Sequence, residues 1–389
     1  MIAYLRSQGV NITEGNRVRL LKSGEEKFDD LFMAIRKAKH YIHLEYFNFR
    51  NDSIAALLFA ELDKKVQEGV KVRAMFDAFG NWSNNKPLKK KHLRELGKRG
   101  IEIVKYDPLN FPFIDDFISR DHRKIIIIDG QTAYTGGMNV ADYYIEGLPA
   151  IGEWRDMHLR IEGPAVDELQ RIFLTMWEEA TGERLIDSSI YFPEKNDSLH
   201  IEGTIDGISI GIVDRVPRKK PKLMRNAYAH AILSAEDKIE IINPYFIPTR
   251  TVRRALKQAV DKGVDLQVMV SVKGDIVVTP DASLFVARKL HKHGATIYQF
   301  EGGFHHSKIM MVDDKFCTVG STNLNSRSLN YDYEVNAFIF DARVTSELSQ
   351  MFSQDIQKST LMTDENWKHH SIWHRFVGWF AYYVLTPFL

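Results

Sequence analysis

The feature that most constrains this chain is a sparse pattern that occurs twice, at 122–139 and at 306–323. Each copy has a His, a Lys two residues later, an Asp five residues after the Lys, and then a Gly-Gly or Gly-Ser pair followed two residues later by an Asn. The members are His122, Lys124, Asp129, Gly137 and Asn139 in the first copy and His306, Lys308, Asp313, Ser321 and Asn323 in the second. Two copies in register predict that the chain contains a duplicated structural unit.

The similarity between the two halves extends beyond these motifs. Other matching segments are 66–80 with 260–274 and 96–106 with 290–300. A repeat of about 190 residues is too long for a solenoid unit and predicts two fused, similar domains. Polar and turn-forming residues gather at 185–206, so we expect a first domain at 1–203 and a second at 204–389.

The residues around each motif predict an α/β fold. A continuous apolar run follows each Lys, at 125–128 and at 309–312, as expected for a strand that is covered on both faces. Side chains two apart in a strand share a face, so each motif His is expected beside its Lys. Such strands alternate with amphipathic helices, which predicts mixed but mostly parallel sheets flanked by helices.

Composition excludes some kinds of site. The 389 residues are 44% hydrophobic and 26% charged, which is typical of a globular protein with room for two cores. Cys317 is the only cysteine, so the chain can form no intrachain disulfide, and its match with Ala133 predicts a small buried strand residue. No cluster of His, Asp and Glu has the spacing of metal ligands, so we expect neither a metal nor another cofactor.

Two sequence features suit a lipid surface. The net charge is only +1, but basic residues concentrate at 84–99 and 215–225, as expected for contact with phospholipid headgroups, with nucleic acid or simply with solvent. The C-terminal segment 373–389 is rich in Trp, Tyr and Phe but too short to span a bilayer. This composition favours a segment in the headgroup region, and the alternative is a terminal helix docked on the core.

The paired histidines suit covalent phosphoryl transfer. One imidazole can attack phosphorus while the other protonates the departing alcohol. Lys124 and Lys308 place a cation beside each imidazole, where it can stabilise the charge of a five-coordinate phosphorus. His305 would point to the opposite face of its strand from His306, so we do not expect it in the site.

The chain resembles the phospholipase D superfamily, and within it the bacterial cardiolipin synthases. The resemblance rests on the doubled motif and on the segments EWRDMHLRIEGPAV (153–166), NPYFIPT (243–249) and SLNYDYEVNAFIFD (328–341). It covers nearly the whole chain, from about residue 18 to the C-terminal residues 385–389. These synthases often begin with two membrane-spanning helices that this sequence does not show, and we see no apolar signal sequence at its N-terminus.

The resemblance implies a fold of two phospholipase D-like domains related by a pseudo-twofold axis, with the active site at their interface. It implies transfer of a phosphatidyl group between two phosphatidylglycerol molecules, giving cardiolipin and glycerol through a phosphatidyl-histidine. The substrate would be an anionic phospholipid, and the enzyme would lie on the cytoplasmic side of the cell membrane without binding nucleic acid. Phosphatidylethanolamine as an alternative donor and the oligomeric state are left open.

The resemblance also implies roles for the motif residues. His122 is our choice of nucleophile, with His306 as the acid and base. The phosphate would be bound by Lys124, Asn139, Lys308, Ser321 and Asn323. The downstream acids that orient the imidazoles match Asp156 and Glu334. Asp129 and Asp313 are signature residues of the motif, and the sequence leaves open whether they are catalytic or structural.

Three alternatives remain. A hydrolytic phospholipase D would use the same residues with water as acceptor and would release phosphatidic acid. A phosphodiesterase or nuclease of the superfamily would suit the basic segments but not the aromatic C-terminus. A membrane-binding scaffold without activity would not need intact His, Lys and Asn in both halves.

Overall fold

The computed structural model describes residues 1–106, 119–196, 203–217, 219–369 and 371–385. Arg218 of the basic segment 215–225 and residues 386–389 of the aromatic C-terminus therefore lie outside the described residues.

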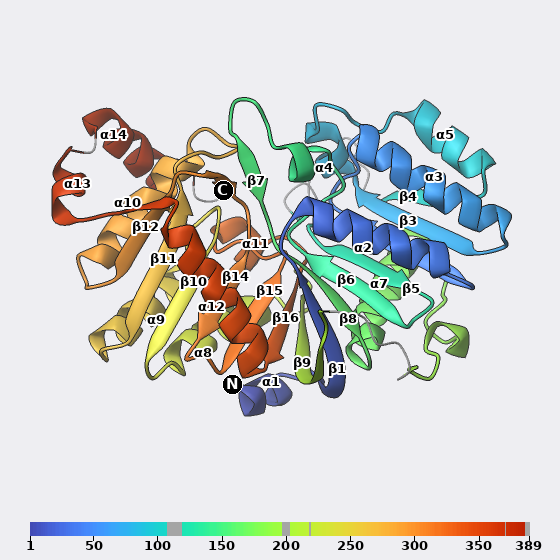
Figure 1. Cartoon of the computed structure of the whole chain (residues 1–389), viewed down its shortest axis with the longest axis horizontal. Helices are drawn as coiled ribbons and strands as arrows, with labels where there is room; N and C mark the ends of the chain where they lie inside the picture. The colour runs from blue at the N-terminus through green and yellow to red at the C-terminus, as the bar shows by residue number, and fades with distance from the viewer. Residues whose placement is uncertain (107–118, 197–202, 218, 370, 386–389) are drawn as a thin grey trace.

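One continuous mixed sheet runs through both halves of the chain (Figure 1). At its centre β1 (Ile12–Leu21) pairs with β9 (Ile205–Arg215). Outward from β1 come β8 (His158–Glu162), β6 (Thr132–Gly136), β5 (Lys124–Ile128), β2 (Tyr41–Tyr46), β3 (Lys71–Asp77) and β4 (Glu102–Tyr106). Outward from β9 come β16 (Glu334–Phe340), β15 (Phe316–Gly320), β14 (Ile309–Val312), β10 (Lys238–Ile242), β11 (Asp265–Ser271), β12 (Thr296–Phe300) and β17 (Ser359–Leu361). The same strand order on both sides of the centre confirms the predicted duplication and its pseudo-twofold symmetry.

The sheet is mixed, but the expectation that it is mostly parallel was wrong. Among the described strands of this sheet, parallel pairing joins only β2 to β3 to β4 in one half and β10 to β11 to β12 in the other. These are the strands that crossover helices connect, such as α3 (Ser53–Gln67) between β2 and β3. The other neighbouring strands of this sheet pair antiparallel, and some of these pairs are joined by a tight turn, as β5 and β6 are.

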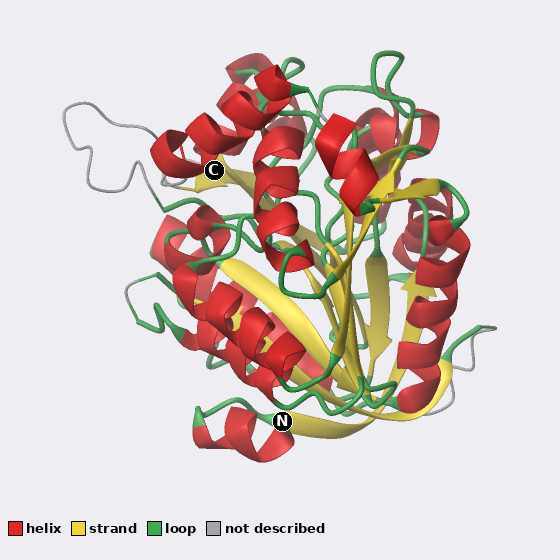
Figure 2. Ribbon diagram, turned by 90° about the vertical axis from the view of Figure 1, so that its left-hand side faces the viewer, coloured by secondary structure: helices red, strands yellow, loops and turns green. Residues whose placement is uncertain are grey.

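Helices cover both faces of the sheet (Figure 2). Those of the first half include α2 (Gly24–Lys37), α4 (Ala78–Ser83), α5 (Lys90–Lys98), α6 (Tyr143–Glu146) and α7 (Ala165–Thr181). Those of the second half include α8 (Leu223–Leu233), α9 (Arg250–Asp261), α10 (Thr279–His291), α11 (Ser326–Asn330), α12 (Ala342–Ile356), α13 (Asp364–His369) and α14 (Ile372–Phe380).

The apolar core is shared between the halves. Phe173 of α7 and Phe352 of α12 belong to one buried cluster that also contains Ile125 of β5 and Ile309 of β14. Two further clusters lie under the remaining helices, each made mostly of residues of one half. The halves are therefore fused through a common layer in addition to the two cores that the composition allowed.

The first helix, α1 (Ile2–Ser7), packs on the second half of the chain. Leu5 lies in the same buried cluster as Met224 of α8, and the ring of Tyr4 stacks on His230 with centroids 4.0 Å apart. The boundary between 203 and 204 stays a prediction, but the residues ahead of β1 contact the domain that follows it. Among the described residues, no helix is both long and apolar enough to cross a bilayer.

A separate two-stranded sheet ties the halves together next to the motifs. It pairs β7 (Glu153–Arg155) of the first half with β13 (Gly303–His305) of the second half in parallel. Close packing requires glycine here, because a Cβ at Gly303 would lie 2.2 Å from the carbonyl oxygen of Glu153. This pairing places the residues just before His306 against those just before Asp156.

Candidate active site

The two motifs meet at one cleft of about 690 Å³ that residues of both halves line. His122 precedes β5, His306 precedes β14, and both line this cleft. The backbone fixes them, because the His122 N–H donates to the Tyr333 carbonyl at 3.0 Å and the His306 N–H donates to the Arg155 carbonyl at 2.6 Å. Tyr333 directly precedes Glu334, and Arg155 directly precedes Asp156. The backbone of each half thus binds the motif histidine of the opposite half.

Each imidazole is paired with an acid of the opposite half. The Nδ1 atom of His122 lies 3.1 Å from Oε1 of Glu334, and the Nδ1 atom of His306 lies 2.6 Å from Oδ2 of Asp156. The sequence identified both acids but not this exchange of partners. Because Nδ1 is bound to an acid in each dyad, Nε2 is the nitrogen left for chemistry on a substrate.

The two dyads differ in their electrostatics. Burial raises the pKa of Glu334 to about 7, despite nearby lysines. Burial acts in the same direction on Asp156, but Lys308 and His306 outweigh it and hold the pKa of that carboxyl below its usual value. Burial, together with nearby cations, lowers the pKa of both histidines, and that of His122 falls well below the ordinary value. Of the two imidazoles, His306 beside a firmly ionised acid is the better placed to hold a proton.

The two motif lysines lie beside their histidines, as predicted. Lys124 donates to the His122 carbonyl at 2.5 Å, and Lys308 donates to the His306 carbonyl and lies 2.9 Å from its Nδ1. Both ammonium groups are buried, which lowers the pKa of Lys124 to about 7 and that of Lys308 to about 8. They place positive charge behind the histidines rather than on the cleft surface.

The motif asparagines line the cleft from both sides. Asn139 and Asn323 are nearly buried, and among the described residues neither side-chain oxygen has a hydrogen-bond partner. Lys27, which the sequence did not single out, fixes the first of them by donating to the Asn139 carbonyl at 3.0 Å. Each free oxygen is an acceptor and suits a donor such as a ligand hydroxyl, whereas a phosphate oxygen would need the amide NH₂ group.

Gly137 and Ser321 occupy matching positions but do different things. Ser321 was expected to bind phosphate; instead its hydroxyl donates to Glu334 and accepts from the Val335 N–H at 3.0 Å. Gly137 cannot be replaced in the same way, because a Cβ there would lie 2.1 Å from Oδ1 of Asp156. Asp156 thus packs against the backbone of Gly137, whereas Glu334 accepts a hydrogen bond from the Ser321 hydroxyl.

Asp129 and Asp313 lie at the far ends of β5 and β14 from the histidines. The Asp129 carboxylate accepts the N–H groups of residues 39–41 at 2.7 to 2.9 Å, and Asp313 accepts those of residues 236–238 at 2.8 to 3.0 Å. Both residues have φ of 52°, a conformation that Asp tolerates better than most residues. Their position does not support a catalytic role; each fixes the turn ahead of the next strand of the sheet.

Aromatic side chains form a wall around His306 that sequence reasoning missed. The ring centroids of Trp154, Tyr245 and Phe304 lie 5.5, 6.1 and 5.3 Å from that of the imidazole. Tyr245 is fixed by its hydroxyl, which donates to Asp275 at 2.5 Å. Trp154 and Tyr245 lie within the sequence segments EWRD and NPYF. These segments contributed to the family resemblance but indicated no role for either residue.

Residues that the sequence placed outside the site do lie outside it. His305 points away from the cleft and binds Asp355 through Nε2 at 2.9 Å. Cys317 is a buried strand residue opposite Met311, as Ala133 is opposite Ile127, and burial raises the pKa of its thiol to about 12. Within the described part of the chain, no group of His, Cys, Asp and Glu is arranged to hold a metal.

Comparison with known proteins agrees with this geometry. A sequence model of the family described as cardiolipin synthase, PLD-like domain, matches residues 31–177 and 228–356. A probable cardiolipin synthase of Bacillus subtilis (strain 168) is 38% identical over 356 residues, which are 91% of this chain and 69% of that protein. A cardiolipin synthase of Staphylococcus aureus (strain Mu50) is 35% identical over 367 residues, which are 94% of this chain and 72% of that protein.

The fold also matches a solved structure. The crystal structure of phosphatidylserine synthase from Haemophilus influenzae Rd KW20 superposes with a TM-score of 0.74. The match covers 100% of both chains at 14% sequence identity, so it shows the fold and no more.

Proposed function

The chain belongs to the cardiolipin synthase family with phospholipase D-like domains, and on that premise we propose that it transfers a phosphatidyl group between two phosphatidylglycerol molecules. The products are cardiolipin and glycerol. The single observation that supports this best is the placement of His122 and His306 on one cleft, each with Nδ1 on an acid and Nε2 left for the substrate.

In the first step His122 Nε2 attacks the phosphorus of one phosphatidylglycerol. The bond between phosphorus and the headgroup glycerol oxygen breaks, and the His306 imidazolium gives its proton to that oxygen. Glycerol leaves, and the phosphatidyl group stays on His122. In the second step neutral His306 takes the proton of a primary hydroxyl of another phosphatidylglycerol. Its oxygen attacks phosphorus, the P–N bond breaks, and its electron pair returns to His122.

The difference between the dyads supports His122 as the nucleophile. A general acid must hold a proton, and His306 is paired at 2.6 Å with a carboxylate whose pKa is lowered. A nucleophile must be neutral, and burial beside Lys124 keeps the pKa of His122 well below its ordinary value. Glu334 then stabilises the positive charge that the His122 ring gains in the intermediate.

The phosphate oxygens would be bound where the two halves meet. Asn139 and Asn323 line the cleft, and each carries an amide NH₂ group that can donate to a phosphate oxygen, while the two buried lysines add positive charge behind them. Together they can stabilise the extra negative charge of the transition state, because donors fixed in advance act strongly in a buried site. The aromatic wall around His306 suits the apolar part of a lipid.

The cleft opens beside side chains that suit a membrane surface. Trp82 is 71% exposed and Val277 is 88% exposed, and each is one residue away from a residue that lines the cleft, Ser83 or Ile276. The segment 84–99 begins with two residues that line the cleft, Asn84 and Asn85, and its basic residues suit the anionic cytoplasmic leaflet. We therefore place the enzyme on the cytoplasmic face of the membrane as a peripheral protein.

The test is incubation of the purified protein with isotope-labelled phosphatidylglycerol vesicles, with the lipid products resolved by mass spectrometry. The proposal expects cardiolipin and free glycerol in equal amounts, both lost in His306→Ala. Phosphatidic acid as the sole product would show hydrolysis instead. Absence of turnover in any phospholipid would contradict the proposal.

A further inference from the structure

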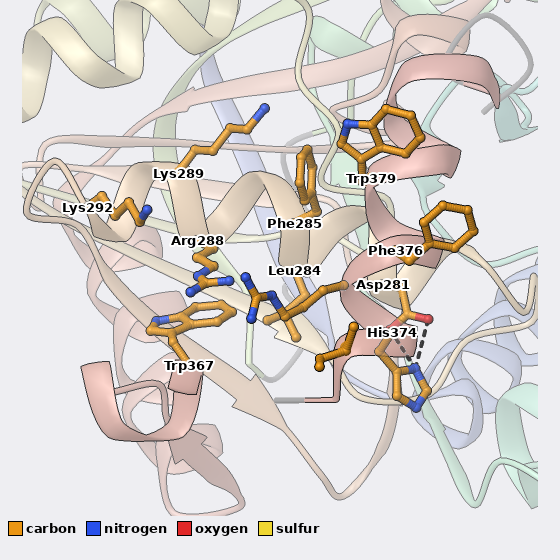
Figure 3. Close-up of a pocket in the computed structure, with 12 residues that line it drawn as sticks. Asp281, Leu284, Phe285, Arg288, Lys289, Lys292, Trp367, His374, Phe376 and Trp379 are labelled. Carbon is orange, nitrogen blue, oxygen red and sulfur yellow. Dashed lines mark hydrogen bonds and ion pairs between the residues drawn. The ribbon is translucent and has the colours of Figure 1, made fainter. Parts of the chain in front are cut away.

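A second cavity, of about 620 Å³, lies between α10 and the C-terminal helix α14 (Figure 3). It shares no lining residue with the catalytic cleft, although α10 connects the two sites. Thr279 at the start of α10 lines the cleft, whereas Asp281, Leu284 and Arg288 further along the helix line the second cavity. The proposed reaction gives this cavity no role.

Small residues dock α14 on α10 and leave its aromatic face exposed. A Cβ at Gly378 would lie 2.4 Å from the Asp281 carbonyl oxygen, and Ala381 just beyond the helix is fully buried. Trp373 is 67% exposed and Phe376 is 52% exposed. The helix is thus docked on the protein, which was the alternative expectation for segment 373–389. It still presents an aromatic face, which suits the other expectation, a segment in the headgroup region.

The cavity is strongly basic. Its cationic lining residues are Arg288, Lys289, Lys292 and Arg375. Among the described residues, none of these four has an ion pair with an acid. The one acid that lines the cavity, Asp281, is bound by His374 at 3.0 Å. Burial and the nearby charge of Arg375 both lower the pKa of Arg288. An anion bound between the two guanidinium groups would therefore reduce their mutual repulsion.

Aromatic rings hold two of the cations in place. The guanidinium of Arg288 lies over the ring of Trp367, 5.8 Å from its centroid, and the two are seen together in Figure 3. The Lys289 ammonium lies 4.3 Å from the centroid of Phe285 and donates to the Tyr383 hydroxyl at 3.4 Å. Cations fixed among aromatic rings suit the boundary between lipid headgroups and acyl chains.

We propose that this cavity binds the phosphodiester headgroup of an anionic membrane phospholipid, while the exposed face of α14 rests among the acyl chains. The site is an anchor distinct from the catalytic cleft. It would orient the enzyme so that the start of α10, and with it the cleft, faces the bilayer. The inference goes beyond the proposed reaction, since its test measures binding rather than turnover.

The test uses the full chain as the His306→Ala variant, so that the lipids are not converted. Flotation measures its binding to phosphatidylcholine vesicles with and without phosphatidylglycerol. The double substitution Arg288→Gln with Arg375→Gln should weaken binding to the phosphatidylglycerol vesicles about thirtyfold, as the loss of two cations near an anionic surface implies. Binding to pure phosphatidylcholine should be weak and unchanged.

Two comparisons make the test specific. The control Arg254→Gln with Lys262→Gln removes the same charge from the region of α9 and should change binding less than threefold. Arg288→Lys with Arg375→Lys keeps the charge and should restore most of the binding. An equal loss in the control, or no loss in the glutamine variant, would overturn the site. In the otherwise wild-type chain, the glutamine variant should still convert detergent-dispersed phosphatidylglycerol, so failure of the anchor is distinguishable from failure of the proposed reaction.

Discussion

His122 and Glu334 are 212 residues apart in the chain, yet Nδ1 of the imidazole lies 3.1 Å from the carboxylate. His306 and Asp156 repeat the relationship in the opposite direction at 2.6 Å. The acid that orients each imidazole is thus supplied by the other half. The catalytic unit is the interface of the repeat, and neither half contains a complete dyad.

This exchange predicts that an acid in one half controls the histidine in the other. Asp156→Asn removes the charge that keeps a proton on His306 and should lower kcat between about a hundredfold and ten thousandfold, the range for loss of general acid and base catalysis. Steady-state assays on phosphatidylglycerol would measure this. A substrate with a leaving group that needs no protonation should recover the first step in this variant. Lack of any recovery would contradict a role through His306.

The matching positions Gly137 and Ser321 offer a paired test of the two acids. Gly137→Ala places a Cβ 2.1 Å from Oδ1 of Asp156 and should displace that carboxylate from His306. Ser321→Ala removes only one donor from Glu334 and should reduce kcat about tenfold, as expected for one hydrogen bond to a charged group. Activity and melting temperature should be measured together. A larger loss in Ser321→Ala than in Gly137→Ala would contradict the account.

The motif aspartates should matter for stability rather than for chemistry. Asp129→Asn keeps the residue shape and its tolerance of positive φ but removes the charge that holds three backbone N–H groups. We expect a loss of about 1–3 kcal/mol in the free energy of unfolding, typical of weakened bonds to a charged acceptor. At temperatures where the variant is folded, kcat should stay within about threefold, a change small against the loss for a catalytic group. Asp313→Asn is the matched variant. A large loss of kcat in a fully folded variant would instead show that these residues take part in the reaction.

The buried lysines predict a loss of activity at alkaline pH. The pKa of Lys124 is lowered to about 7 and that of Lys308 to about 8, so each is a cation below these values and neutral above them. Positive charge behind the phosphate is therefore lost as the pH rises, and kcat/KM should fall on the alkaline side with an apparent pKa between about 7 and 8 that belongs to the coupled site. Lys124→Arg keeps its charge and should move this limb upward. A flat profile from neutral to strongly alkaline pH would contradict the prediction.

Much of the site could be predicted from the sequence because the repeat marks it twice. The spacing of His122 to Lys124 and of His306 to Lys308 identified the strand ends and their shared face, and the family resemblance indicated Asp156 and Glu334. The exchange of acids was not predictable, because it depends on how the two halves are placed about the pseudo-twofold axis. The pairing of β7 with β13, which sets this placement, involves too few residues to show a strand pattern.

The remaining differences also have physical reasons. Asp129 is as regular in the motif as the catalytic residues, and only its hydrogen bonds to residues 39–41 show that it holds a turn. The excess of antiparallel over parallel pairs in the mixed sheet was not predicted, because continuous apolar runs mark buried strands without giving their direction. The roles of Trp154 and Tyr245 depend on which face of the cleft they reach, and no spacing rule gives that.

The most direct test of the account is to trap the covalent intermediate. The His306→Ala variant, mixed with a phosphatidyl ester whose leaving group needs no protonation, should form the intermediate but lack the base to resolve it. After a denaturing quench that preserves phosphoramidates, peptide mass spectrometry should find the phosphatidyl group on His122, with none in His122→Ala. An adduct on another residue of the single variant, or rapid turnover with no adduct, would contradict the two-step mechanism with His122 as nucleophile.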